Sequence, residues 1–120
     1  MMNDEYGILS QAVKLLDKKM AIDMVCLDVS DLTILSHYFV ICTGGSTSQI
    51  NALCDELREK MAPYILKVEG KEESGWVIIQ LDGVMVHVFS RQMRDYYSLE
   101  HLWEDTVKID ISKLLEEGAE

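Results

Sequence analysis

Two apolar runs joined by an Asp-Gly pair constrain the fold of this chain more than any other feature of its sequence. Residues 76–81 (Trp-Val-Ile-Ile-Gln-Leu) and 84–89 (Val-Met-Val-His-Val-Phe) are both rich in β-branched side chains. The intervening Asp82-Gly83 predicts a β-hairpin, because a two-residue type I′ turn needs positive φ at both central positions. The runs are apolar nearly throughout instead of alternating, which predicts that both faces of the sheet are covered here, by helices or by a partner on each side.

Three segments have the sequence features of helices. A first helix is predicted to follow Asn3, whose side chain can cap it, because apolar residues recur after it at helical spacing. A second is predicted to begin at a cap on Thr47 or Ser48 and to end before Pro63, since the residue before a proline is pushed out of the helical region. Ser90 can cap a short third helix.

Three further segments are predicted strands. Residues 24–29 alternate in polarity, residues 38–42 form a continuous apolar run typical of a buried strand, and residues 64–68 fit a short edge strand before a polar loop over 69–75. The chain therefore contains both a strand–helix–strand crossover and a hairpin. We predict a single α/β domain over residues 1–120, with a mixed β-sheet of about five strands and flanking helices.

The acidic balance of the chain limits its partners. The net charge is −10, from 11 basic and 21 acidic residues, so direct nucleic-acid binding as the main contact is disfavoured. Two interpretations of this charge stay open, a basic protein partner and solubility alone. Residues 104–120 carry six acids against two lysines, and we predict an acidic C-terminal extension after a core of residues 1–103.

Cysteine usage and hydropathy indicate a cytoplasmic protein without a membrane segment. Cys26, Cys42 and Cys54 stand singly, which is typical of buried, reduced thiols. The first residues are polar and acidic, so we expect no signal peptide. No apolar run reaches the roughly 20 residues that span a bilayer.

One glycine-rich turn has two interpretations. Gly44-Gly45-Ser46 follows a predicted strand and precedes a helix, where backbone N–H groups can cradle a phosphate. Nucleotidyltransferases with such a turn also need two carboxylates, one residue apart on a later strand, to hold metal ions. The later strands of this chain carry no such pair. We therefore favour a tight turn and predict no catalytic residue, no metal and no cofactor, with a nucleotidyltransferase-like enzyme as the alternative.

Histidines and aromatic residues supply the remaining candidates. His37, His87 and His101 lie apart without the spacing of metal ligands. His87 lies within an apolar strand, which predicts a hydrogen-bonded core or interface histidine instead of a general base. Four aromatics fit either interface anchors or core packing, and both interpretations stay open: Trp76, Tyr96, Tyr97 and Trp103.

Three groups of residues, in order along the chain, resemble the signatures of one family. The first is Tyr38-Phe39-Val40-Ile41-Cys42-Thr43-Gly44 followed by Ser46 and Gln49, and the second is Glu69-Gly70 followed by Gly75-Trp76. The third is Val86-His87-Val88-Phe89 followed by Arg94, Tyr97, Leu99-Glu100 and Leu102-Trp103. Together they resemble the ribosomal silencing factor family, also called the Iojap family. The chain departs from the family pattern at His37, where Asp is usual, and at Asp82-Gly83, where Gly-Asp is usual.

The resemblance implies both a fold and a function. It implies a nucleotidyltransferase-like α/β fold without catalytic carboxylates, and so a binding protein instead of an enzyme. It also implies binding to large-subunit ribosomal protein fourteen, which blocks joining of the small subunit and lowers translation when nutrients are scarce, and a homodimer. We expect the partner to contact the hairpin and the segment after it, through Trp76, Val77, Ile79, Leu81, Arg94 and Tyr97.

Overall fold

The computed structural model describes residues 4–98, 101, 104 and 106–117. Its helices and strands follow in the order α1 (Glu5–Lys18), β1 (Ile22–Asp28), β2 (Tyr38–Thr43), α2 (Thr47–Lys60), β3 (Ile65–Lys71), β4 (Trp76–Leu81), β5 (Val84–Phe89), α3 (Arg91–Tyr97), β6 (Val107–Ile109) and α5 (Ile111–Glu117). Two short 3-10 turns, η1 (Ala62–Tyr64) and η2 (Glu72–Ser74), flank β3.

One six-stranded sheet forms the centre of the fold, with strand order β3-β4-β5-β2-β1-β6. β2 and β5 are parallel, and the other neighbouring pairs are antiparallel. Thr43 and Phe89, the last residues of the parallel strands, are paired with each other, so both central strands end at the same edge of the sheet. The predicted mixed α/β sheet is confirmed, and β6 is the strand that the sequence did not predict.

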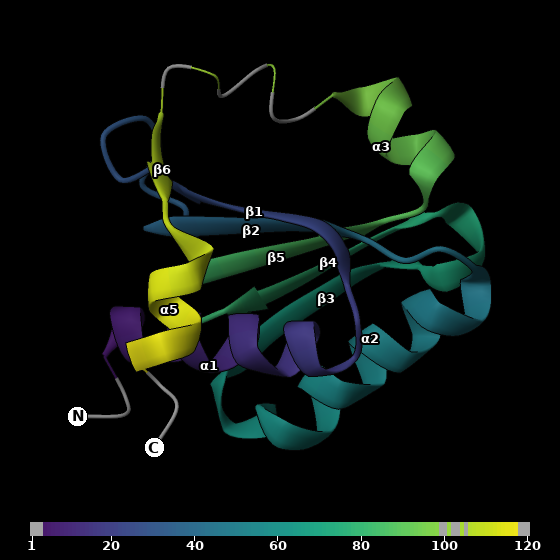
Figure 1. The fold of residues 1–120 in the computed structure, drawn as a ribbon, viewed down its shortest axis with the longest axis horizontal. Coiled ribbons are helices and arrows are strands. Elements are labelled where there is room, and N and C mark those ends of the chain that lie inside the picture. The colour runs from purple at the N-terminus through teal and green to yellow at the C-terminus, as the bar shows by residue number, and fades with distance from the viewer. Residues whose placement is uncertain (1–3, 99–100, 102–103, 105, 118–120) are drawn as a thin grey trace.

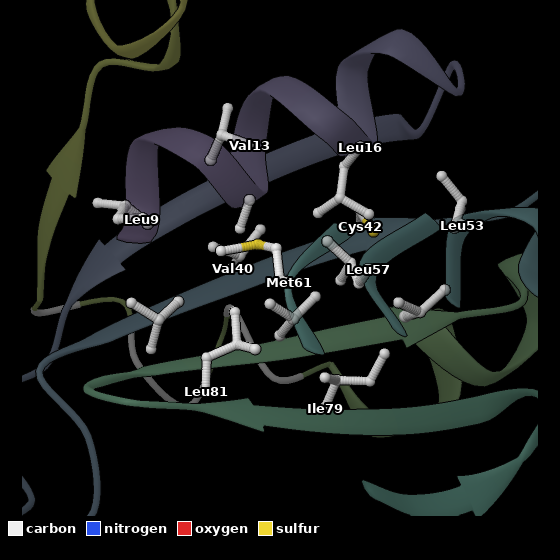
Figure 2. Close-up of a cluster of buried hydrophobic side chains, with 14 of the residues drawn as sticks. Leu9, Val13, Leu16, Val40, Cys42, Leu53, Leu57, Met61, Ile79 and Leu81 are labelled. Carbon is white, nitrogen blue, oxygen red and sulfur yellow. The ribbon is translucent and has the colours of Figure 1, made fainter. Parts of the chain in front are cut away.

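Helices α1, α2 and α5 lie on one face of the sheet, while α3 lies toward the opposite face (Figure 1). The larger hydrophobic cluster joins α1 and α2 to the covered face, and Figure 2 shows Ile79 and Leu81 of β4 directed into it alongside Leu57 and Met61. Each fully buried aliphatic side chain of this kind contributes about 2 kcal/mol. A smaller cluster on the opposite face contains Leu27, Val29, Phe39, Ile41 and Phe89.

The acidic C-terminal segment is built into this core. Ile109 of β6 pairs with Cys26 of β1. Leu114 of α5 is fully buried, and its carbonyl accepts a hydrogen bond from Ser10 Oγ of α1 at 3.3 Å. The boundary predicted after residue 103 therefore does not coincide with an edge of the fold, because a few apolar side chains in the segment pack inward despite its charge.

Element ends differ from the predictions in three places. The α1 cap is Asp4, whose Oδ1 accepts from the Gly7 N–H at 2.6 Å; the predicted cap Asn3 lies outside the described residues. β1 begins at Ile22, before the predicted start. β3 continues to Lys71, into the predicted loop, because its pairing with β4 supplies backbone partners that the local sequence does not reveal.

The predicted hairpin is confirmed, but its predicted turn type is wrong. Gly83 has a φ of 81°, whereas Asp82 is not among the residues with positive φ, so the turn is not type I′. The Gly83 carbonyl accepts hydrogen bonds from the His37 and Tyr38 N–H groups at 3.0 and 3.1 Å. A Cβ at Gly83 would overlap the Glu5 side chain. The turn therefore adapts to α1 and to the start of β2.

Candidate functional site

The two faces of β4 have different environments. Val77, Ile79 and Leu81 have no exposed surface and lie in the larger core cluster. The expectation that these three side chains contact a partner is therefore not carried forward, because fully buried side chains present no surface to one. Trp76 and Ile78 point to the opposite face and are only partly buried. Helices therefore do not cover this face of β4 completely, and the covering of this face by a partner stays a prediction.

Trp76 is the centre of an aromatic cluster on this second face. Its ring lies 5.0 Å from that of Phe89, its cross-strand partner on β5, and 4.4 Å from that of Tyr97 on α3. Tyr97 is itself 40% exposed, so the cluster reaches the surface. The structure therefore brings together Trp76 and Tyr97, two of the residues that the sequence suggested for partner contact.

His87 lies beneath this cluster and is fixed by Trp76. The Trp76 Nε1–H donates to His87 Nδ1 at 3.2 Å, so the imidazole proton lies on Nε2, for which the structure gives no partner. His87 is 4% exposed, and burial lowers its pKa to about 4. The prediction of a hydrogen-bonded core histidine is confirmed. A histidine with this pKa is neutral at physiological pH.

An apolar loop beside β4 was missed by the sequence analysis. Leu32, Ile34 and Leu35 in the turn between β1 and β2 are all more than half exposed. Gln80 of β4 donates from Nε2 to the Leu35 carbonyl at 3.4 Å, which places the loop next to the second face of the sheet. Three apolar residues within the four positions 32–35, between two predicted strands, were the signal that could have identified it.

These features form one surface, which we call the docking face. It consists of Trp76 and Ile78 of β4, Met85 of β5 and the loop residues Leu32, Ile34 and Leu35. Three of these side chains are exposed and three are partly exposed, and large apolar patches on the surface of a monomer mark interaction sites. The docking face replaces the buried hairpin residues as the candidate partner-binding surface.

His37 holds the base of this loop to two other elements. Its Nδ1 lies 2.7 Å from Glu5 Oε1 of α1, and its Nε2 lies 3.7 Å from Asp28 Oδ2 at the end of β1. Ser30 donates two hydrogen bonds to Asp28, which lower the pKa of that carboxyl group below its usual value. An Asp at position 37, as in the family pattern, would instead face two carboxylates. The histidine is therefore compatible with this local acidic setting.

The donors of the Gly44-Gly45-Ser46 turn are already engaged. The Gly44 N–H donates to the Phe89 carbonyl at 2.8 Å, and the Gly45 N–H donates to Gln49 Oε1 at 2.6 Å. Ser46 Oγ accepts from the Gln49 N–H at 3.1 Å, which makes Ser46 the cap of α2 in place of the predicted Thr47 or Ser48. These N–H groups are not free to cradle a phosphate, which supports the tight-turn interpretation.

Arg94, the last predicted contact residue, lies apart from the docking face. It is 9% exposed, and its Nη1 donates to Thr43 Oγ1 at 2.9 Å at the end of β2. Arg94 lines a pocket of about 680 Å³ together with Asp23, Val25, Thr43, Arg91, Asp95, Ser98 and His101. α3 therefore contributes Tyr97 to the aromatic cluster and Arg94 to a separate cavity.

The remaining candidates from the sequence are the three cysteines and the residues that could hold a metal ion. Cys26, Cys42 and Cys54 are free and buried, and burial raises the pKa of each thiol to about 12, so the predicted burial is confirmed. Within the part of the chain that the structure describes, no group of three or more His, Cys, Asp or Glu side chains is arranged to hold a metal ion. The same residues include no helix long and apolar enough to cross a membrane.

Removal of the α2 cap should have a small effect. We expect Ser46→Ala to lower the free energy of unfolding by about 1 kcal/mol, because the Gln49 N–H loses its acceptor. Ser46→Asp, which keeps an acceptor at the cap, should retain nearly wild-type stability. Urea denaturation of the three proteins measures the difference. Equal stability of Ser46→Ala and wild type would contradict the assignment of Ser46 as the cap.

Comparison with known protein families gives one consistent result. A family model described as "Ribosomal silencing factor during starvation" matches residues 3–120. The chain is 35% identical over 111 residues to the Bacillus subtilis protein named ribosomal silencing factor RsfS, covering 90% of this chain and 94% of that protein. It is 28% identical over 102 residues to the mouse protein named mitochondrial assembly of ribosomal large subunit protein 1, covering 79% of this chain and 44% of that protein.

A solved structure has the same fold. A crystal structure of a protein from Chromobacterium violaceum superposes with a TM-score of 0.79 at 33% sequence identity, covering 84% of this chain and 87% of that one. The similarity therefore extends over most of both chains and includes the sheet that carries the docking face.

Proposed function

Because the chain belongs to the ribosomal silencing factor family, we propose that it binds the large ribosomal subunit in the cytoplasm and sterically blocks joining of the small subunit. Its contact there is large-subunit ribosomal protein fourteen, and the result is lower translation when nutrients are scarce. The large subunit is supported by the name of the mouse relative. The identity of the contacted protein, large-subunit ribosomal protein fourteen, and the link to nutrient scarcity both follow from the family resemblance in the sequence motifs.

The docking face is the observation that carries this proposal. It combines an aromatic anchor, Trp76, with exposed apolar side chains of a loop whose backbone is hydrogen-bonded to β4. Aromatic residues and fixed apolar side chains supply most of the binding energy at protein interfaces. A specific interface needs about 800 Å² per partner, and a surface that includes the second face of β4 together with the adjoining loop is suited to that size.

Charge favours a basic partner. The chain has a net charge of −10, and many ribosomal proteins are basic because they contact rRNA phosphates. Opposite charge around an apolar contact accelerates association and disfavours acidic partners. Steric occlusion requires no chemistry beyond binding, so the proposal assigns no catalytic role to any residue. The same proposal includes a homodimer, which forms when the protein is not bound to a ribosome.

The alternative of a nucleotidyltransferase-like enzyme has no supporting observation in the described residues. Its turn, Gly44-Gly45-Ser46, uses its donors within the fold. A Cβ at Gly44 would lie 2.7 Å from Ile50 Cγ1, so the glycine is explained by close packing against α2. Phosphoryl transfer also depends on metal-borne positive charge, and the described acids form no group that fits a metal.

A charge introduced into the docking face should abolish binding without unfolding the protein. We expect Ile34→Asp to weaken association with purified large subunits by at least about tenfold, because a carboxylate buried in an apolar interface loses its hydration. Ile34 is fully exposed in the free protein, so the free energy of unfolding should change by less than about 0.5 kcal/mol. Co-sedimentation with large subunits measures binding, and light scattering measures subunit joining.

Met20→Asp provides the matched control. Met20 is 76% exposed, and it precedes β1, whereas the loop with Ile34 follows that strand, so the two sites lie at opposite ends of β1. The control variant has the same change of charge and hydropathy and should bind and block subunit joining as the wild type does. Equal binding by Ile34→Asp and Met20→Asp would show that the docking face is not the ribosomal contact.

A further inference from the structure

A pocket at the carboxyl ends of β2 and β5 has no part in the proposed function. It is the cavity of about 680 Å³ described above, within the size range of small-molecule sites. Thr43, the last residue of β2, lines it, and Arg91 and Arg94 enter it from α3, which directly follows β5. In open α/β sheets, ligands bind outside the carboxyl ends of parallel strands, because the adjoining loops diverge there.

Two guanidinium groups line this pocket although the chain as a whole is acidic. Arg91 and Arg94 stand against the two acids Asp23 and Asp95, with His101 also in the lining. The chain has 11 basic and 21 acidic residues, whereas the pocket has two arginines and two acids, so it lacks the acidic excess of the whole protein. A pocket of this composition can bind an anion through its arginines, and its carboxylates can accept hydrogen bonds from ligand hydroxyl or amino groups.

The two guanidinium groups are placed differently. Arg94 is buried, and the Thr43 hydroxyl accepts from its Nη1 at 2.9 Å, which fixes the group in the pocket wall. Arg91 is exposed and makes no side-chain hydrogen bond or ion pair with any residue that the structure describes. Its Nη2 lies 3.6 Å from the position that a Cβ on Gly45 would occupy, which places the guanidinium group beside the turn after β2. A fixed and an adjustable guanidinium together match the geometry of phosphate oxygens.

The rim of the pocket contains strained backbone. Asp23 has a φ of 50°, in the left-handed region that residues other than glycine rarely adopt. Its side chain makes no hydrogen bond or ion pair within the described part of the chain. Strained backbone of this kind is concentrated at ligand sites, where it holds a side chain in position. Asp23 thus contributes a carboxylate to the same pocket lining as Arg91 and Arg94.

We propose that this pocket binds a small phosphorylated metabolite. Phosphate oxygens contact the guanidinium groups of Arg91 and Arg94. The carboxylates of Asp23 and Asp95 accept from hydroxyl or amino groups on the rest of the ligand, such as those of a ribose or a base. The site is one of binding only. It is distinct from the docking face and does not depend on the proposed ribosomal role.

Calorimetric titration of the full chain tests this site at constant ionic strength. The probes are inorganic phosphate, pyrophosphate, AMP and GMP, each up to millimolar concentration. We expect saturable binding of at least pyrophosphate or a nucleotide. Arg91→Gln should weaken it about tenfold or more, as the loss of a charge-assisted hydrogen bond does. Asp95→Asn, which removes a nearby negative charge, should instead strengthen binding of pyrophosphate severalfold.

Arg58→Gln is the matched control. Arg58 lies near the far end of α2 and is paired with Glu72 and Asp55, outside the pocket. Arg58→Gln removes the same positive charge as Arg91→Gln. An effect of net charge alone would therefore weaken probe binding equally in both variants. The site is supported if binding is saturable, weakened by Arg91→Gln and retained by Arg58→Gln. Comparison of the nucleotides with pyrophosphate identifies which part of the ligand is recognised. Absence of saturable binding by all four probes, or equal losses in both variants, would overturn it.

Discussion

Replacement of Trp76 by alanine is expected to lower the free energy of unfolding by about 3 kcal/mol and to abolish large-subunit binding. The ring packs against Phe89 and Tyr97 and donates to His87, so its removal leaves a cavity and an unpaired His87 Nδ1. Because the residue is partly exposed in the docking face, its loss also removes an aromatic anchor. Urea denaturation and co-sedimentation, both at a temperature where the variant is folded, measure the two effects separately.

Trp76→Phe distinguishes the contributions of the ring and the N–H group. The phenyl ring keeps most of the aromatic contact but cannot donate to His87. We expect this variant to lose about 1 kcal/mol of stability, the typical contribution of one hydrogen bond, and to retain part of the binding. Unchanged affinity of folded Trp76→Ala would show that Trp76 has only a structural role. A loss of stability below about 1 kcal/mol in Trp76→Ala would instead contradict the packing of the cluster.

Acidification from pH 7 to pH 4 is expected to remove about 3 kcal/mol of stability through His87. Burial lowers the pKa of His87 to about 4 from an ordinary value of 6.5. Between these two values the unfolded state binds a proton that the folded state does not bind, so stability falls as the pH decreases through this window. Protonation also turns Nδ1 into a donor, which breaks the hydrogen bond from Trp76.

Variants separate this effect from the titration of other groups. His87→Gln cannot gain the proton, so its stability should change less between pH 6.5 and pH 4 than that of the wild type. His101→Gln removes an exposed histidine instead and should keep the wild-type dependence. Asp28 and Glu72 have lowered pKa values, so their contribution begins to be lost as the pH falls through their ordinary values of 3.8 and 4.5, and this loss is common to the wild type and His87→Gln. Urea denaturation at a series of pH values measures the difference, and parallel curves for wild type and His87→Gln would contradict it.

The structure also shows why some predictions from the sequence succeeded. The hairpin over residues 76–89 was predicted from the Asp-Gly pair between two β-rich runs, and Gly83 does adopt a positive φ in the connection, although Asp82 does not. The strand over residues 38–42 was predicted because β2 is covered on both faces, which leaves an uninterrupted apolar run. In both cases the signal lies within a few neighbouring residues, where turn chemistry and burial act directly on the local sequence.

The sequence did not show which side chains of β4 are buried, and the reason is different. Nearly every residue of β4 is apolar, so the sequence could not show which alternate set faces the helices. The register with β3 and β5 decides this and places Val77, Ile79 and Leu81 against α1 and α2. A shift of one residue would exchange the two faces. Only the pairing of whole strands therefore determined which side chains can reach a partner.

The sequence by itself determined the family, the α/β class and the location of the hairpin, because motifs and local periodicity are properties of neighbouring residues. Tertiary structure alone decided which face of the sheet is available, and it placed Arg94 in a pocket with Thr43, 51 positions away along the chain. It also brought the loop with Ile34 beside β4 and inserted the acidic C-terminal segment into the core. These arrangements arise from contacts between residues far apart in sequence, which are favourable only once the sheet has formed.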